Sequence, residues 1–141
     1  MIGKKVSLKV RMSAGEAHYA GELVNGSHIV DFWGDVGTEL MIRSDGDESL
    51  FAGYKDIEFT APVYAGDFME YVGWIEKEGK TSRTCKFEAY KYIELTRDKN
   101  DAISAARVLE KPLLCGRATG TLVVKKEFQR GVQDEAFKVE K

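Results

Sequence analysis

The feature that most constrains the fold of this chain is the stretch from Asn25 to Arg43, NGSHIVDFWGDVGTELMIR, a long segment with a clear helical period. Its apolar residues recur at steps of three and four, which places them on one face of a helix. They are Ile29, Phe32, Trp33, Val36 and Leu40. A face this broad needs a sheet to cover it. The stretch therefore predicts one central helix around which the rest of the chain packs.

The opposite face of the predicted helix is polar and gathers three carboxylates within about three turns. Its residues are His28, Asp31, Asp35, Thr38 and Glu39. Asn25 or Ser27 can cap the start, which leaves backbone N–H groups and the positive end of the helix dipole free to hold a polarised carbonyl oxygen. Gly34 and Gly37 each cost roughly 1 kcal/mol relative to Ala inside a helix, so we expect them to mark close packing.

Length and charge place the chain among single-domain globular proteins. It has 141 residues, 43% of them hydrophobic, which is enough for a core without metal or disulfide support. The 21 basic residues are balanced by 23 acidic ones, which argues against nucleic-acid binding. No apolar run is long enough for a signal peptide or a membrane span, so we expect a cytoplasmic protein without a membrane partner. Cys85 and Cys115 are expected to be free, buried thiols.

Five segments around the helix have the pattern of strands. They cover residues 5–12, 50–59, 68–77, about 81–95 and 113–125. In the fourth of them, Lys91 interrupts an otherwise apolar inner row. Residues 13–26 are expected to form a loop that leads into the helix, and residues 96–112 a connection long enough to line a site.

The order of these elements predicts an α+β fold. Hairpin-type links among the later strands make the sheet mostly antiparallel, and its apolar face has one helix of suitable length to cover it. We therefore expect a curved antiparallel sheet wrapped around a central helix in a single domain, residues 1–125. Residues 126–141 are expected to form a charged tail that is mobile or packs on a neighbouring subunit.

Several motifs resemble those of the hot-dog fold. FTAPVYAGD, residues 59–67, resembles the F-x-x-P-V-x-x-G-D element of acyl-CoA thioesterases and hydratases with that fold. Gly21 followed by DFWGD, residues 31–35, resembles the thioesterase helix whose Asp serves as general base. The resemblance to the 3-aminoacyl-CoA ammonia-lyases covers nearly the whole chain. It is carried by HYAGELVNGSHIVDFWGDVGTELMIR, LFAGYKDIEFTAPVYAGDFMEYVGWIEK and CGRATG.

This resemblance implies a carbon–nitrogen lyase of amino-acid fermentation. Such an enzyme removes ammonia reversibly from β-alanyl-CoA or 3-aminobutyryl-CoA and gives a 2,3-enoyl-CoA, acryloyl-CoA or crotonyl-CoA. The resemblance also implies active sites shared between two subunits, and so a homodimer or a larger homo-oligomer. Coenzyme A enters as part of the substrate, and no separate cofactor is expected. An acyl-CoA thioesterase in which Asp35 activates water is the alternative, and a non-catalytic acyl-CoA-binding module is a third hypothesis.

The implied reaction needs a base, a partner for the thioester oxyanion and a place for a cation. The helix N-terminus at Asn25, Gly26 and Ser27 is expected to hold the thioester oxygen. Asp35, about two turns along, is the candidate base. His18 is a candidate for handling the proton because imidazole titrates near neutrality.

Further candidates are less sharply defined by their pattern. Glu58 and Glu39 are candidates for gripping the ammonium, with Tyr19 and Tyr54 as aromatic or hydroxyl partners. Each of these carboxylates could equally be an ordinary solvated surface group. The candidates for the CoA phosphates are basic residues near the end of the chain: Lys111, Arg117 and Lys125. The 2 histidines lack a zinc-binding motif, so no metal site is expected.

Overall fold

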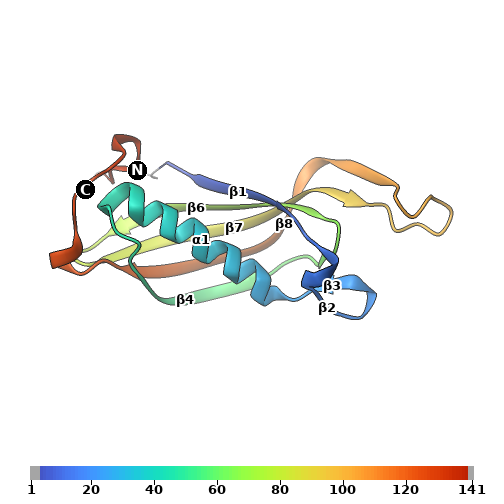
Figure 1. The fold of residues 1–141 in the computed structure, drawn as a ribbon, viewed down its shortest axis with the longest axis horizontal. Coiled ribbons are helices and arrows are strands. Elements are labelled where there is room, and N and C mark those ends of the chain that lie inside the picture. Colours follow the sequence, from blue (N-terminus) through green and yellow to red (C-terminus); the bar gives the residue numbers. More distant parts are fainter. Residues whose placement is uncertain (1–3, 140–141) are drawn as a thin grey trace.

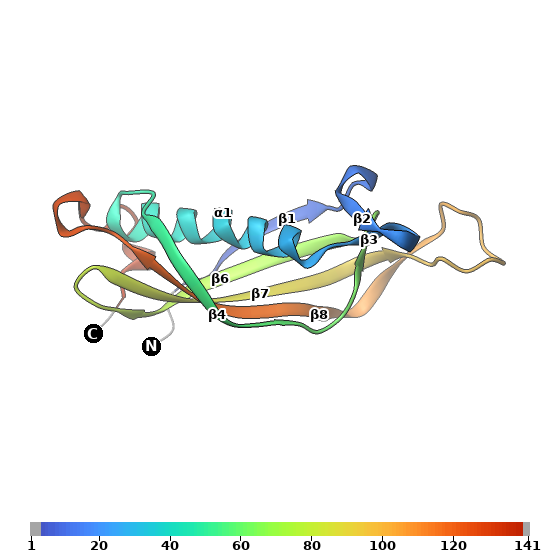
Figure 2. The same ribbon diagram turned by 90° about the horizontal axis from the view of Figure 1, so that it is seen from below.

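The fold consists of a five-stranded antiparallel sheet with one long helix across one of its faces (Figure 1). The computed structural model describes residues 4–139. The helix is α1 (Gly26–Asp45), and the side view shows the sheet curving beneath it (Figure 2). In the order β1-β6-β7-β8-β4, the strands are β1 (Val6–Arg11), β6 (Phe68–Glu78), β7 (Ser82–Leu95), β8 (Ala106–Val123) and β4 (Leu50–Phe59). Each strand is antiparallel to its neighbours, as predicted.

The apolar face of α1 is buried against the sheet. Trp33 is 0% exposed, and its indole N–H donates a 3.0 Å hydrogen bond to the carbonyl of Glu88 in β7. Gly37 packs closely, because a Cβ there would lie 3.1 Å from the side chain of Leu122. Gly34 differs, since no described atom outside its own helix would lie within 4 Å of a Cβ. Close packing therefore explains Gly37 but does not explain Gly34 within one protomer.

A second, small sheet precedes the helix where the sequence predicts a loop. It contains β2 (Ala17–Tyr19), β3 (Leu23–Val24) and β5 (Val63–Tyr64). The 3₁₀ turn η1 (Ala14–Glu16) precedes β2, and η2 (Ala20–Glu22) lies between β2 and β3. Strands of two or three residues are too short to show an alternating pattern, so the sequence does not reveal them. Because β3 leads directly into α1, this sheet fixes where the helix begins.

The last two strands extend into an arm that projects beyond the rest of the sheet (Figure 1). The prediction of a connection through Pro112 is wrong, because β8 already begins at Ala106, which pairs with Leu95 of β7. The connection is therefore limited to residues 96–105. Its Ile103 is 99% exposed.

The C-terminal segment packs on the end of α1 in the same chain. It contains the 3₁₀ turns η3 (Lys126–Phe128) and η4 (Glu135–Phe137). The amide of Arg130 donates to the carbonyl of Asp45, and the Phe137 side chain is buried. Residues 126–139 thus pack on their own chain, and a contact of this segment with a neighbouring subunit stays a prediction. Whether residues 1–125 form a domain without it stays a prediction. No helix of the described chain is long and apolar enough to cross a membrane.

Candidate functional site

The start of α1 borders a cavity of about 370 Å³, which we call the helix-end cavity. It lies between β3, the first helical turn and the segment that joins β4 to β5. Its lining residues are Tyr19, Leu23, Val24, Asn25, Gly26, Ile29, Phe59, Thr60, Ala61, Pro62 and Val63. The pairing of Val24 with Val63 brings the two sides of the cavity together. Three residues expected to bind substrate, Tyr19, Asn25 and Gly26, thus come from different elements to one cavity.

The backbone amides in the first turn of α1 are not capped by the side chain of Asn25. Asn25 occupies the N-cap position but makes no side-chain hydrogen bond to the helix backbone within the described residues. Its Nδ2 donates instead to the Ser27 hydroxyl, and its Oδ1 is buried without a partner among the described atoms. A Cβ on Gly26 would lie 2.5 Å from the Phe59 ring. Only a glycine therefore lets the ring pack this close to the amide end of the helix.

The acidic stripe of α1 faces away from the sheet. Asp31, Asp35 and Glu39 are all exposed in the single protomer, and none of them lines the helix-end cavity. Glu39 forms an ion pair with Arg43 at 3.0 Å. The structure therefore places the candidate base, Asp35, on the open surface of the helix.

Tyr54 of β4 lies between the helix and the aromatic core. Its hydroxyl donates a long hydrogen bond of 3.4 Å to the carbonyl of Val30, and its ring stacks on Phe51 with the centroids 4.3 Å apart. Burial raises the pKa of Tyr54 well above its usual range, and the negative charge of Asp31 raises it further. The phenol is therefore a neutral hydrogen-bond donor at physiological pH. Asp31 is the carboxylate of the acidic stripe that raises the pKa of Tyr54.

Glu58 lies on the face of the sheet that is turned away from α1. It forms an ion pair with Arg117 of β8 at 2.9 Å. Both residues line a second cavity, of about 440 Å³, together with Trp74, Lys86 and Glu88. Glu58 and Asp35 are thus separated by the sheet and the helix within one protomer.

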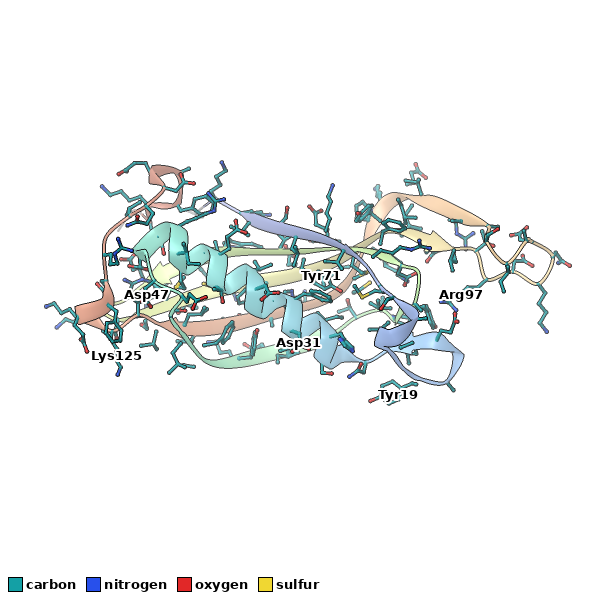
Figure 3. All side chains as sticks on the ribbon, viewed as in Figure 1. Tyr19, Asp31, Asp47, Tyr71, Arg97 and Lys125 are labelled. Atoms are coloured by element: carbon teal, nitrogen blue, oxygen red, sulfur yellow. The ribbon has the colours of Figure 1, made fainter. Side chains whose placement is uncertain are left out.

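The three candidates for the CoA phosphates do not form a cluster within one protomer. Arg117 is paired with Glu58, and Lys111 lies in the arm. Lys125 follows β8 at the end of the molecule opposite Tyr19 (Figure 3). The side chain of His18 lies outside the described residues. No group of three or more His, Cys, Asp or Glu side chains in the described chain is placed to hold a metal ion.

A buried lysine behind the helix-end cavity is the main feature that the sequence did not assign to the site. Lys91 of β7 is 2% exposed, and its Nζ lies 3.0 Å from Asp67 Oδ2 and 3.0 Å from the carbonyl oxygen of Pro62. The interruption of the apolar row by a lysine was the available signal. This signal shows that Lys91 is unusual but cannot show which groups its ammonium binds.

Both cysteines are free and buried, as predicted. Burial raises the pKa of Cys85 to about 12. Burial also raises the pKa of Cys115, to about 11, although the positive charge of Lys91 acts in the opposite direction. Both thiols are therefore protonated at neutral pH and are poor nucleophiles.

Comparison with known proteins decides the family. No protein-family model matches the chain. The chain is 52% identical over 126 residues to a 3-aminobutyryl-CoA ammonia lyase of Acetoanaerobium sticklandii, in a match that covers 89% of this chain and 98% of the relative. The chain belongs to the 3-aminoacyl-CoA ammonia-lyase family. The expectation from its motifs is thereby confirmed.

Solved structures agree with this family and confirm the hot-dog fold. The β-alanyl-CoA:ammonia lyase from Clostridium propionicum has 60% sequence identity and a TM-score of 0.93, with 98% of this chain and 96% of that chain covered. A hexameric hot-dog thioesterase of Campylobacter jejuni has 15% identity and a TM-score of 0.69, with 92% and 90% covered. At that identity the thioesterase supports the fold alone.

Proposed function

We propose that this ammonia-lyase family member removes ammonia reversibly from a β-aminoacyl-CoA, β-alanyl-CoA or 3-aminobutyryl-CoA, to give acryloyl-CoA or crotonyl-CoA. The observation that carries the proposal is the start of α1, whose amides have no side-chain cap from Asn25 and which borders the helix-end cavity. The relatives' names supply the substrate class, because they are a 3-aminobutyryl-CoA and a β-alanyl-CoA ammonia lyase.

The proposed chemistry begins with loss of the proton next to the thioester carbonyl. Negative charge then develops on the thioester oxygen, and the amides of Gly26 and Ser27 at the positive end of the helix dipole stabilise it. The β-ammonium leaves as ammonia while the double bond forms. The Oδ1 of Asn25, buried without a partner among the described atoms, is an acceptor that an N–H group of the substrate can use.

We propose Asp35 as the base, in a site that a second protomer completes. Asp35 is exposed in one protomer, and a partner covering the acidic stripe would desolvate its carboxylate and raise its basicity. The edge strand β4 supports assembly, because it exposes Leu50, Ile57 and Phe59 along ten residues, and an edge of this kind invites pairing with another chain. We therefore propose a homodimer or a larger homo-oligomer with shared active sites.

The other candidates keep their proposed roles in that assembly. His18 is proposed to handle the proton, and Glu39 and Glu58 to grip the ammonium with Tyr19 and Tyr54 as aromatic or hydroxyl partners. The proposed contacts of the CoA phosphates are Lys111, Arg117 and Lys125. We also propose that the enzyme acts in the cytoplasm and needs no cofactor besides the CoA of its substrate.

The proposed function is tested by incubating purified protein with crotonyl-CoA or acryloyl-CoA and ammonium, while enoyl absorbance and free thiol are followed together. Loss of enoyl absorbance without release of thiol is expected. Release of thiol would instead identify a thioesterase on the same scaffold. Binding of the thioester without either change would identify an acyl-CoA-binding module.

A further inference from the structure

A charged pair is buried directly behind one wall of the helix-end cavity. Asp67 is 0% exposed, and its Oδ2 accepts hydrogen bonds from Lys91 Nζ at 3.0 Å and from the amide of Tyr64 at 2.7 Å. Its Oδ1 is buried without a partner among the described atoms. Glu94 adds a second carboxylate 3.5 Å from Lys91 Nζ. The Lys91 ammonium group is thus enclosed by two carboxylates and the carbonyl oxygen of Pro62.

The same ammonium group ties together the two ends of the turn that forms the cavity wall. Lys91 Nζ bonds the carbonyl of Pro62 at one end and the carboxylate of Asp67 at the other. Pro62 and Val63 line the cavity, and Val63 pairs with Val24, which is next to the N-cap residue Asn25. Lys91, together with the pairing of Val63 and Val24, therefore holds the wall that faces the amide end of α1.

Packing alone does not account for a lysine at this position. Lys91 continues the inner row of β7 that contains Cys85, Phe87 and Ala89, where an apolar residue would be the ordinary choice. Replacing both members of a buried ion pair by uncharged residues is often neutral or stabilising, whereas removing one member is strongly destabilising. A buried pair in which Asp67 Oδ1 has no partner among the described atoms thus points to a geometric role.

We propose that Lys91 is a positioning residue for the ammonia-lyase reaction. By holding the Pro62 carbonyl, it fixes the distance between the wall at Pro62–Val63 and the helix amides that receive the thioester oxygen. The inference rests on the proposed function. Its consequence is that loss of Lys91 lowers kcat even when stability is restored, because misplacement by about 1 Å can cost on the order of a hundredfold in rate.

The test separates position from stability with a double variant. Lys91→Met leaves Asp67 buried as an unpaired charge, and Lys91→Met with Asp67→Asn removes both charges but keeps an acceptor for the Tyr64 amide. We expect the double variant to melt at a higher temperature than Lys91→Met. We expect kcat with crotonyl-CoA and ammonium to stay at least about tenfold below wild type in both, with KM for crotonyl-CoA changed by less than about threefold.

A matched control exists at the other end of the same helix. Arg83 and Asp45 form an ion pair that is similarly buried, with Arg83 Nη2 and Asp45 Oδ1 2.9 Å apart, and it lies away from the helix-end cavity. Arg83→Met with Asp45→Asn is expected to leave kcat within about twofold of wild type. An equal loss of kcat in this control would overturn the proposal, as would recovery of kcat together with stability in the Lys91/Asp67 double variant.

Two further measurements keep the outcome clear. Lys91→Gln keeps an amide donor for the Pro62 carbonyl without the charge, and we expect its kcat to exceed that of the double variant by at least about threefold. Equal kcat values would contradict the positioning role even if Lys91→Met did not fold. Wild-type activity is measured first in the same assay. An inactive wild-type protein would overturn the proposed function, whereas a fully active double variant would overturn only the role of Lys91.

Discussion

The two ends of α1 are built in opposite ways. At its C-terminal end, Gly46 adopts a left-handed conformation and its amide caps the carbonyl of Ile42. Asp45 is bound by both Nε and Nη2 of Arg83, and the C-terminal segment packs over the last turn. At its N-terminal end, Asn25 does not cap the helix backbone, and a buried oxygen lacks a partner among the described atoms. We call these the closed end and the open end.

The difference shows how one helix can serve stability and chemistry at once. Polar groups that are hydrogen-bonded within the fold stabilise it and are not available to bind a ligand. Polar groups left unsatisfied lower stability and are available for binding. In this protein Arg83 binds the Asp45 carboxylate at the closed end, whereas Asn25 Oδ1 beside the helix-end cavity has no partner among the described atoms.

The largest expected effect is on stability at the closed end. Arg83→Met leaves the Asp45 carboxylate buried without its partner, which should lower the free energy of unfolding by about 3–5 kcal/mol. Urea denaturation followed by circular dichroism measures the loss. A loss below about 1 kcal/mol would show that Asp45 reaches water and that this end is not closed.

The next effect is on activity and tests the acidic stripe. Asp35→Asn should lower kcat at least about a hundredfold, the low end for a general acid–base group, with little change in stability because Asp35 is exposed. Asp31→Asn is the matched control one turn earlier and should retain most of kcat. If Asp31→Asn were the inactive variant, the base would be the carboxylate nearer to Tyr54.

Alanine substitutions at Gly46 and Gly34 should change the stability in opposite directions. Gly46→Ala should cost at least about 1 kcal/mol, because Gly46 has a φ of 72° and a Cβ would lie 2.8 Å from Gln133 Nε2. Gly34→Ala should gain about 0.5–1 kcal/mol, because Ala favours the helix and no described atom outside the helix would lie within 4 Å of its Cβ.

Thermal melts of the Gly46→Ala and Gly34→Ala variants, with the oligomeric state measured by light scattering, test these two predictions. A Gly34→Ala variant that is destabilised or dissociated would show that another protomer packs against the helix at this position. The open surface of α1 would then be an interface in the assembled enzyme.

The smallest expected effect concerns Asn25. Loss of an N-cap residue usually costs about 1 kcal/mol, but Asn25→Ala should cost less than about 0.5 kcal/mol because no side-chain bond to the helix backbone is lost. Asp134→Ala is the comparison at the closed end, where Asp134 caps the amide of Ala136 and pairs with Arg43. Chemical denaturation of both variants measures the contrast. A larger loss for Asn25→Ala would mean that the open end is capped in solution.

Much of this fold could be predicted from local patterns. Ile29, Trp33, Val36 and Leu40 show the helix and its buried face because helical period is a property of neighbouring residues. The strand over residues 106–112 was missed because it depends on a distant partner: Val108 is 75% exposed, and its place in the strand comes from pairing with Ile93. Three-dimensional pairing of this kind leaves no alternating pattern to recognise.

The start of the central helix was predictable from the sequence, whereas the contacts of several candidate site residues were not. The helix start was identified because caps and dipoles follow from sequence position. The face of Glu58 could not be assigned, because β4 shifts register between Lys55 and Glu58 and simple alternation fails across such a shift. The partner of Lys91 could not be assigned either, because Pro62 and Asp67 are brought to it by the packing of separate strands.

The burial of the two thiols has a consequence for an enzyme that handles electrophiles. The proposed products carry a double bond conjugated to a thioester, and thiolates add readily to such bonds. Cys85 and Cys115 are the 2 cysteines of the chain, and both are enclosed in the core and held in the protonated state. Burial therefore keeps both cysteine sulfurs of the protomer away from an electrophilic product in the site.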